Sequence, residues 1–363
     1  MNKYLELMEK ENIECSLVLS TPNIYYLTGY EGGGFLIICR DNVAKLYVPV
    51  LEYTRAKASV KNANVIVKAY SKYPLKEIVI ENYVSGDFPS IVKKELENYK
   101  KIGLDKNITL GTYERIEQYL RDKELIDMSK HLSKLRSIKS TEEIDLILKA
   151  VEITEKALRK AIDKIHEGIS ELELAGEIEY YMKSYGAPIT AFPSIVAFGE
   201  NSAYPHAVPS ERKLGNSDIV LIDIGARVNG YCSDMTRTFS YKYSNDTFEK
   251  RLEAVINAQL EAIDYIAPGV KASEVDSKAR ECLRKEGLAK YFIHGLGHGV
   301  GVEVHELPTL SPNSNDVLEK GMVVTIEPGI YFDGVYGIRV EDLVLVTSRG
   351  CRVLTKFSKM LEL

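Results

Sequence analysis

The sequence predicts an α+β protein in which a small amino-terminal α/β domain, residues 1–130, precedes a larger carboxyl-terminal domain, residues 131–363. Three observations favour this class. Short apolar runs alternate with helical patterns in the first part of the chain, as expected for an α/β domain. A helix-capping pattern opens a long helical segment soon after residue 130. A weak internal repeat then divides the second part into two related halves.

The amino-terminal domain opens with a charged amphipathic pattern over residues 1–12, which predicts a helix rather than the apolar segment of a signal peptide. Apolar runs predict strands at 14–20, 34–39, 45–50, 64–68 and 101–104. Helical patterns near 51–60 and 90–99 alternate with these strands. The Gly32–Gly34 triplet matches no phosphate-binding loop, so we expect a plain connection between strands there.

The carboxyl-terminal domain begins with a polar stretch around 127–139, which leads into Ser140-Thr-Glu-Glu143. This tetrapeptide has the form of a capping box, in which the serine oxygen accepts a backbone N–H and the glutamate accepts another in return. From Ile144 to Ile165, apolar residues recur at helical spacing. The pattern therefore predicts a long helix that starts at the capping box.

The internal repeat has a direct consequence for function. A shift of 101 residues aligns eight identical residues within thirty positions, starting at Ala157, and each copy predicts a helix, a glycine-containing turn and a second helix. A predicted hairpin follows each copy. The first hairpin carries Asp223 and Asp234, eleven residues apart, and the second carries Glu327 and Glu341, fourteen apart. Two related hairpins would bring two carboxylate pairs to one centre.

Histidines concentrate just before the second carboxylate pair. Of six histidines in the chain, His294, His298 and His305 fall within twelve residues that also contain four glycines. The four carboxylates lie in or beside apolar, strand-like runs, where an unpaired ionised carboxylate would cost several kcal/mol. A cation beside them removes this cost, so four carboxylates and an imidazole favour a two-metal centre.

The ligand types restrict the metal and the chemistry. Hard oxygen ligands with a single imidazole favour divalent manganese, cobalt, iron or zinc, whereas the lack of thiolates disfavours a structural zinc site. Five protein ligands hold two ions only if carboxylates bridge them. Bridging leaves positions for a water that loses a proton near neutral pH and becomes a nucleophile. The inventory suits hydrolysis of an amide or an ester.

The order of these residues, together with His294-Gly-Leu-Gly-His298 and Ile326-Glu-Pro-Gly329, resembles the pita-bread metallopeptidases. The preceding small domain and the segment 23–29 resemble the prolidase and aminopeptidase P branch, which has a creatinase-type amino-terminal domain. The resemblance implies a pita-bread fold for the second domain and five metal ligands. It implies that Asp223 chelates one ion, that Asp234 and Glu341 bridge both, and that His298 and Glu327 complete the second.

The same resemblance implies roles for five residues. His305 would hydrogen-bond the substrate and stabilise the tetrahedral oxyanion, and Glu327 would carry the proton from the water to the leaving nitrogen. His206 corresponds to a histidine that binds substrate and assists catalysis, and His294 to its neighbour in the pocket. Arg339, two residues before Glu341, fits an arginine that orients the carboxylates.

The function implied is cleavage of the bond before proline by a homodimer with two divalent ions per subunit, manganese or cobalt first and zinc or iron as alternatives. The compact length and the fourteen-residue interval resemble microbial prolidases more than the longer aminopeptidases P. This resemblance implies a prolidase, acting on Xaa-Pro dipeptides, with an Xaa-Pro aminopeptidase that acts on longer peptides as the alternative. A metal-free amidinohydrolase like creatinase and a non-catalytic binding protein are the weaker alternatives, because the carboxylate set is complete.

Composition excludes other classes of function. The net charge is -5 and no long basic run is present, so nucleic acid is not an expected partner. No run of eighteen apolar residues predicts a membrane span. Five cysteines are scattered without a CxxC pair, which argues against both a disulfide framework and a thiolate zinc site. We therefore expect a reducing, cytoplasmic location.

Overall fold

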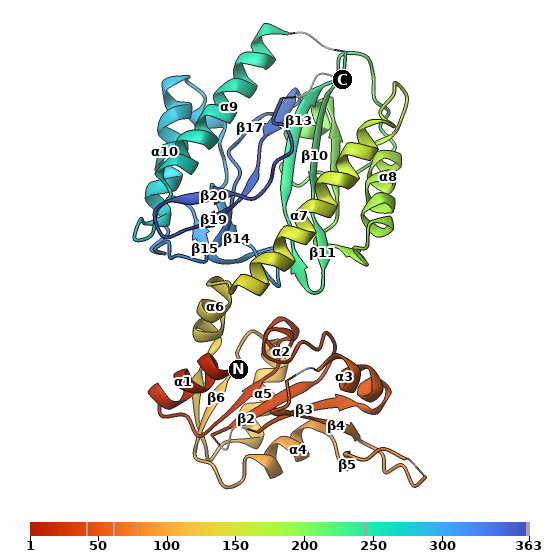
Figure 1. The fold of residues 1–363 in the computed structure, drawn as a ribbon, viewed down its shortest axis with the longest axis vertical. Coiled ribbons are helices and arrows are strands. Elements are labelled where there is room, and N and C mark those ends of the chain that lie inside the picture. Colours follow the sequence, from red (N-terminus) through yellow and green to blue (C-terminus); the bar gives the residue numbers. More distant parts are fainter. Residues whose placement is uncertain (41–42, 61, 78, 243–244, 361–363) are drawn as a thin grey trace. The chain divides into compact units, whose positions relative to one another are not determined.

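The computed structural model describes residues 1–40, 43–60, 62–77, 79–242 and 245–360 (Figure 1). The chain forms two compact units, Met1–Arg136 and Ser137–Leu363. None of the described helices combines the length and the apolar character that a bilayer crossing needs.

The amino-terminal unit is built on one sheet. In the described part of this unit, its strands follow the order β5-β4-β3-β2-β1-β6-β7. Strand β2 runs antiparallel to both of its neighbours, whereas the other adjacent pairs are parallel. The strands are β1 (Cys15–Val18), β2 (Phe35–Cys39), β3 (Ala44–Pro49), β4 (Val65–Ser71), β5 (Tyr83–Ser85), β6 (Lys101–Leu104) and β7 (Glu124–Asp127).

The helices of this unit are α1 (Asn2–Lys10), α2 (Thr21–Thr28), α3 (Tyr53–Ser59), α4 (Phe88–Glu95), α5 (Leu110–Tyr119) and α6 (Ser129–Ser137), with a 3-10 turn, η1 (Val50–Glu52). The polar stretch around 127–139 contains α6, a helix that was not predicted. Its sequence is mostly polar, and the burial of Leu132 in the core stabilises a helix that periodicity alone does not indicate. Helices α2 and α5 and strands β5 and β7 were also not predicted.

The argument against disulfides is wrong for one pair of cysteines. Cys15 and Cys39 are joined by a disulfide, whereas Cys232, Cys282 and Cys351 are free. The two bonded residues lie directly opposite each other in the antiparallel pair β1 and β2. Sequence spacing does not reveal such a pairing, because only the strand register places the two side chains together.

The carboxyl-terminal unit has two similar halves. Helices α7 (Thr141–Ile162) and α8 (Glu171–Ser184) belong to the first, and α9 (Asp246–Tyr265) and α10 (Ala272–Lys285) to the second. A shift of 101 residues carries the bounds of α8 onto those of α10. Gly168 and Gly269, which precede these helices, share a φ of +89°, where a side chain would be strained. The capping box of Ser140 and Glu143 is confirmed.

The strands of this unit repeat the same plan in both halves. They are β8 (Ile189–Thr190), β9 (Ile195–Phe198), β10 (Ile219–Ile224), β11 (Ala226–Val228), β12 (Tyr231–Cys232), β13 (Met235–Ser240), β14 (Gly297–Gly299), β15 (Glu306–Leu310), β16 (Val323–Ile326), β17 (Gly329–Phe332), β18 (Tyr336–Arg339), β19 (Asp342–Val346) and β20 (Cys351–Val353), with 3-10 turns η2 (Gly199–Ala203) and η3 (Ala289–Tyr291). In each half, a long antiparallel pair steps into a short ribbon: β10 and β13 into β11 and β12, with β8 as a third strand beside β11, and β16 and β19 into the two strands β17 and β18.

The helices cover the outer faces of these strands. The apolar residues of α7 and α8 pack with those of β10 and β13 in one core, and the residues of α9 and α10 pack with those of β16 and β19 in another. Figure 1 shows α9 and α10 on one side of the strands and α8 on the other. The strands therefore contribute the polar residues that lie between the two cores. These residues lie at the steps, the junctions where each long strand pair continues into its short ribbon.

Candidate metal centre

The first carboxylate pair lies where β10 and β13 step into the ribbon of β11 and β12. Asp223 is opposite Thr236 in the β10–β13 register, and Asp234 directly precedes β13. Asn229 and Gly230 have φ values of 46° and 76° and form the two-residue turn of the ribbon. Asn-Gly favours this turn because both of its central residues need positive φ. The turn thus returns the chain so that both aspartates lie at the same step.

The second pair occupies the equivalent step of the other half. Ile326 is opposite Asp342 in the β16–β19 register, so Glu327 and Glu341 directly follow and precede this last paired position. Buried Gln259 of α9 donates to the carbonyl oxygens of Ile326 and Val340, at 2.8 and 3.2 Å. These oxygens belong to the residues just before each glutamate, so one amide fixes both backbones.

His298 reaches the step from β14, which pairs with β16. A Cβ atom at Gly297 would lie 2.1 Å from the carbonyl oxygen of Thr325, so only glycine lets the two strands approach this closely. The His298 backbone N–H donates to Thr325 Oγ1 at 3.0 Å, and that hydroxyl donates to Glu327 Oε1 at 3.1 Å. The glycine-rich sequence therefore seats the imidazole beside the glutamate.

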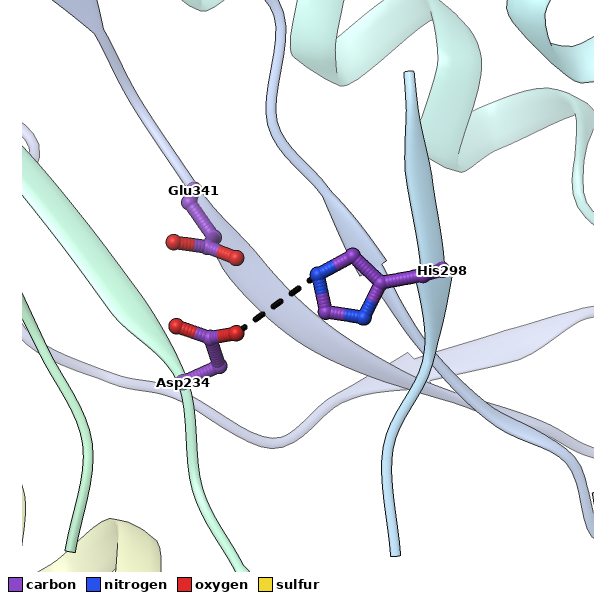
Figure 2. Close-up of side chains that lie close together, drawn as sticks. All are labelled: Asp234, His298 and Glu341. Atoms are coloured by element: carbon purple, nitrogen blue, oxygen red, sulfur yellow. Dashed lines mark ion pairs between the residues drawn. The ribbon is translucent and has the colours of Figure 1, made fainter. Parts of the chain in front are cut away.

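Asp234, His298 and Glu341 point toward one another (Figure 2). One potential ligand atom from each lies within 4.8 Å of the others. His298 Nε2 is 3.7 Å from Asp234 Oδ2 and 3.3 Å from Glu327 Oε1. Its Nδ1 donates to the carbonyl oxygen of Gly299 at 3.1 Å, so Nε2 faces the carboxylates. Burial would lower the pKa of His298, but the hydrogen bond and the charge of Glu327 raise it.

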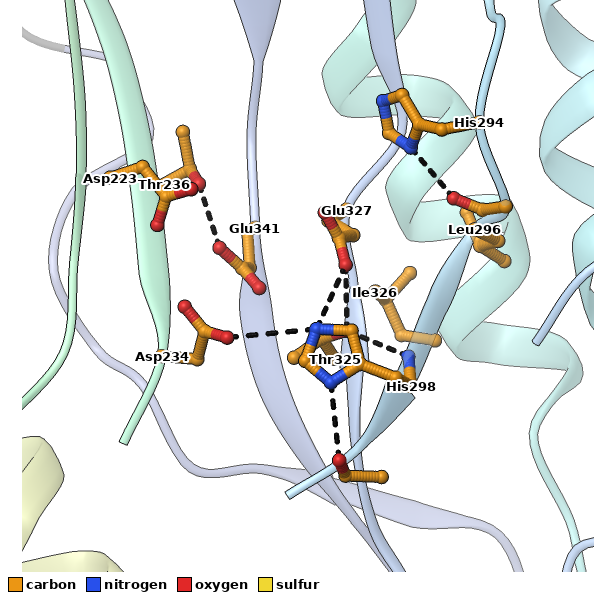
Figure 3. A network of polar contacts seen from close by, with 12 residues as sticks. Asp223, Asp234, Thr236, His294, Leu296, His298, Thr325, Ile326, Glu327 and Glu341 are labelled. Carbon is orange, nitrogen blue, oxygen red and sulfur yellow. Dashed lines mark hydrogen bonds and ion pairs between the residues drawn. The ribbon is translucent and has the colours of Figure 1, made fainter. Parts of the chain in front are cut away.

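Asp223 completes the group from the other side of Glu341 (Figure 3). Arg339 Nη2 donates to its Oδ2 at 2.6 Å, whereas its Oδ1 is buried and has no hydrogen-bond partner among the described residues. A buried carboxylate oxygen normally has a partner, and a bound cation would supply one. With four carboxylates and one oriented imidazole, the donor set fits divalent metal ions.

Electrostatics support the same interpretation. Burial, together with neighbouring carboxylates, raises the pKa of Asp234 and of Glu341 well above their usual values. Burial would also raise the pKa of Glu327, but the hydrogen bond with His298 and the nearby positive charges lower it to about 2. Ionised carboxylates crowded in this way repel each other, and divalent cations would offset the repulsion.

A hydrogen-bonded chain continues from the cluster through Arg339. This buried guanidinium donates to the Tyr331 hydroxyl at 2.8 Å and to the carbonyl oxygen of Pro205 at 3.1 Å. The Tyr331 hydroxyl also contacts His294 Nε2 at 3.0 Å, while His294 Nδ1 contacts the Gly295 carbonyl oxygen at 2.8 Å. A carbonyl only accepts, so Nδ1 carries the proton and Tyr331 donates to Nε2.

Replacing Tyr331 by phenylalanine should lower the free energy of unfolding by about 1 to 3 kcal/mol, because buried groups of Arg339 and His294 each lose a partner. Urea unfolding followed by circular dichroism measures the change. Tyr180→Phe is the matched control, since Tyr180 is exposed and its hydroxyl makes no hydrogen bond within the described residues. Equal stability of the two variants would contradict the role of this hydroxyl.

The two remaining predicted histidines are more exposed. The His305 ring lies 4.2 Å from the His298 ring, edge to face. Burial and the charge of His298 lower the pKa of His305, so its ring is neutral near pH 7. His206 is exposed and follows Pro205, whose carbonyl oxygen is bound by Arg339. The structure thus places His305 beside the carboxylate cluster. It places His206 next to Pro205, which accepts a hydrogen bond from Arg339.

A buried ion pair holds the segment that follows His305. Lys139 Nζ lies 3.2 Å from Glu306 Oε2, and the two side chains are 1% and 3% exposed. Glu306 also accepts the backbone N–H of Glu303 at 3.0 Å. The loop that carries His305 is therefore fixed to the residues just before α7.

Sequence reasoning missed several polar residues that position the carboxylates. Thr236 donates to Glu341 Oε2 at 2.7 Å, and Arg237 donates to the carbonyl oxygen of Glu341. Together with Thr325, Tyr331 and Gln259, they set the orientation of the cluster. The sequence offered one signal for such residues, a threonine or an arginine within an apolar strand beside a candidate carboxylate. A buried polar side chain needs a hydrogen-bond partner, and the carboxylate is the nearest candidate.

Comparisons with known proteins agree with this geometry. The model of metallopeptidase family M24 matches residues 145–348, and that of the creatinase/prolidase N-terminal domain matches residues 1–138. A Xaa-Pro dipeptidase of Pyrococcus horikoshii is 39% identical over 363 residues, which cover 99% of this chain and 98% of that protein. An uncharacterized peptidase of Bacillus subtilis is 35% identical, with 99% of each chain covered.

Solved structures are similar over nearly the whole chain. The prolidase from Pyrococcus horikoshii superposes with a TM-score of 0.88 at 38% identity, covering 99% of this chain and 98% of that one. An X-Pro aminopeptidase from Thermotoga maritima superposes with a TM-score of 0.90 at 30% identity, covering 100% and 99%. The predicted resemblance to pita-bread metallopeptidases and the predicted fold class are confirmed.

Proposed function

Because this chain belongs to metallopeptidase family M24, we propose that it hydrolyses the peptide bond before proline, with Xaa-Pro dipeptides as its preferred substrates. The observation that carries the proposal is the convergence of Asp234, His298 and Glu341 at one point, with Asp223 and Glu327 beside them. Similarity to Xaa-Pro dipeptidases over nearly the full chain supports the choice of substrate.

We assign two divalent ions to this cluster, manganese or cobalt first and zinc or iron as alternatives. Asp223 would chelate one ion, Asp234 and Glu341 would bridge both, and His298 and Glu327 would complete the second. Bound here, the ions would polarise the scissile carbonyl and make a water more acidic. The buried, unpartnered Oδ1 of Asp223 supports its assignment.

The residues around the ions would transfer the proton that hydrolysis requires. Hydrolysis adds the hydroxyl group of water to the carbonyl carbon and its proton to the proline nitrogen. This nitrogen belongs to a tertiary amide and has no hydrogen of its own, so its departure requires a proton donor. Glu327 is an ionised carboxylate held by Thr325 and His298, and it would carry this proton.

The histidines would bind the substrate. Neutral His305 would donate a hydrogen bond to the oxyanion that forms at the carbonyl. His206 would contact the substrate beside Arg339. Both ring nitrogens of His294 are engaged, with Gly295 and Tyr331, so this residue would contribute the face of its ring to the proline pocket.

Replacing His305 by alanine should leave metal content unchanged and lower kcat by on the order of 10²-fold, the cost of one lost oxyanion donor. Steady-state kinetics with metal analysis of the same preparation measures both. His166→Ala is the control, because His166 is exposed in the turn between α7 and α8. An unchanged kcat would remove His305 from the reaction.

A substrate panel tests the proposed function. The metal-loaded protein should hydrolyse Xaa-Pro dipeptides faster than Xaa-Pro-Yaa tripeptides, and preference for tripeptides would identify an Xaa-Pro aminopeptidase instead. Activity should disappear after exhaustive chelation and return with manganese or cobalt. Turnover that survives chelation would favour a metal-free amidinohydrolase, and a complete lack of peptidase activity would favour a binding protein.

The homodimer and the cytoplasmic location stay predictions. Light scattering of the purified protein tests the first, and a strict monomer would contradict it. Cell fractionation tests the second. The Cys15–Cys39 disulfide removes part of the cysteine argument for a reducing compartment, so the fractionation result decides the location.

A further inference from the structure

The amino-terminal unit contains a cavity of about 500 Å³ that includes none of the residues assigned to hydrolysis. The cavity lies at the carboxyl ends of β1 and β6, which are adjacent and parallel. From β1 the chain continues to β2 on one side, whereas from β6 it continues to β7 on the other. Such a reversal in an α/β sheet opens a crevice between the two connecting loops, where ligands characteristically bind.

Aromatic rings form the floor of the cavity. Phe35 begins the antiparallel strand β2, so it lies at the same edge of the sheet as the ends of β1 and β6, and it is buried. Its ring meets Phe88 edge to face at 4.9 Å and Tyr70 at 5.5 Å. Because the Phe35 ring is already stacked on Tyr47 at 4.8 Å, it supports the floor from beneath. The partly exposed rings of Tyr70 and Phe88 offer a flat apolar group of a ligand a surface on which to stack.

The walls carry both polar and apolar side chains, and hydrogen bonds fix them in place. Residues 19–22 follow β1 and residues 107–109 follow β6, and both segments line the cavity. Buried Asp105 joins them: its Oδ2 accepts the backbone N–H and the hydroxyl of Ser20 at 3.1 and 2.6 Å, and its Oδ1 accepts the backbone N–H of Asn107 at 3.2 Å. The crevice is therefore formed before any ligand arrives, and the charge of Asp105 is already satisfied.

The charge of the lining has one sign. Arg115 of α5 lines the cavity, and no aspartate or glutamate does so among the described residues. Its guanidinium is exposed and makes no ion pair or hydrogen bond within the described part of the chain. An arginine is always charged and presents parallel N–H donors that match a carboxylate or a phosphate.

We propose that this cavity binds a small molecule in which a flat apolar group is joined to one anionic group, a carboxylate or a phosphate. The apolar group lies on Tyr70 and Phe88, above the buried ring of Phe35, and Arg115 binds the anion at the rim. The volume is within the range of small-molecule sites, about 300 to 1,000 Å³. The site goes beyond the proposed peptidase function and depends on none of its residues.

Calorimetric titration of the full-length, metal-loaded protein tests the proposal with phenylacetate and phenyl phosphate as probes and benzyl alcohol as the uncharged analogue. At least one anionic probe should bind saturably and more tightly than benzyl alcohol. Arg115→Gln should weaken that binding at least tenfold. Arg121→Gln is the matched control, because Arg121 is exposed, follows the same helix and does not line the cavity.

A second variant tests the position of the site. Thr21 is exposed at the rim and makes no side-chain hydrogen bond among the described residues, so Thr21→Trp should fill the opening without disturbing the core. Loss of probe binding in this variant supports the cavity. Binding of phenylacetate alone would identify a carboxylate ligand, and binding of phenyl phosphate alone a phosphorylated one.

The metal centre provides the competing explanation for an anionic probe. Binding there would be the same in Arg115→Gln, Thr21→Trp and the unmodified chain, and this result would overturn the proposal. The lack of saturable binding by either probe would also overturn it. Dipeptide hydrolysis should be unchanged in both variants, so failure of this proposal can be told apart from failure of the proposed peptidase function.

Discussion

Replacing Glu341 by alanine is expected to abolish dipeptide hydrolysis and to release at least one metal ion. Glu341 is 1% exposed, and Thr236 holds its Oε2 at 2.7 Å, so the carboxylate has a fixed orientation toward Asp234 and His298. As the proposed bridge, it would serve both ions, so its loss should weaken the binding of both. Elemental analysis and kinetics of the purified variant measure the two losses.

Asp234→Ala should have the same effect, because Asp234 is the other proposed bridge. Asp333→Ala is the matched control: it removes an exposed carboxylate from the turn between β17 and β18, only a few residues from Glu341. Circular dichroism should show the same fold in all variants. A Glu341→Ala protein that retains two ions per chain and full turnover would refute the bridging assignment and, with it, the proposed centre.

The second large effect concerns Arg237, which is expected to stabilise the centre through the backbone of the residues that carry it. Arg237→Met should lower the free energy of unfolding by about 3 to 5 kcal/mol, the range for breaking a buried ion pair. The side chain is 1% exposed, and its Nη2 lies 2.8 Å from Asp342 Oδ1. It also donates to the backbone oxygens of Thr236 and Glu341.

Two further bonds explain why lysine cannot substitute for this arginine. Nε donates to the carbonyl oxygen of Ser358 at 3.0 Å, and Nη2 donates to that of Phe357 at 2.7 Å. The planar guanidinium thus joins β13, β19 and the segment at residues 357 and 358, a geometry that a single ammonium cannot reproduce. Arg237→Lys should therefore also be destabilised, although less than Arg237→Met.

Denaturant unfolding measures this prediction, with Arg352→Met as the control. Arg352 is an exposed arginine on β20 in the same unit, so its loss should change stability by no more than about 0.5 kcal/mol. If Arg237→Met unfolded at the same denaturant concentration as this control, the buried pair would contribute nothing. Metal affinity should also fall in Arg237→Met, because the backbone of Glu341 loses its support.

Local sequence patterns predicted much of the fold. They failed where the burial of a side chain or the register of two strands determines the structure. The capping box of Ser140 and the repeated glycine turns were readable, because hydrogen bonds between near neighbours and positive φ create them. Helix α6 and the Cys15–Cys39 bond were not. A mostly polar sequence became a helix through the burial of Leu132, and two distant cysteines met through the register of β1 and β2.

The candidate centre was also predictable from the sequence only in part. The sequence by itself determined which residues were candidates, because a carboxylate within an apolar run and a histidine among glycines are costly unless they bind something. Only the tertiary structure decided that Asp223 faces Arg339, that His298 directs Nε2 at the acids, and that Thr236, Gln259 and Arg237 hold the acidic residues in place. These partners come from strands and helices far apart in the chain, and the orientation of a buried charge depends on donors that meet it only after the two halves have packed.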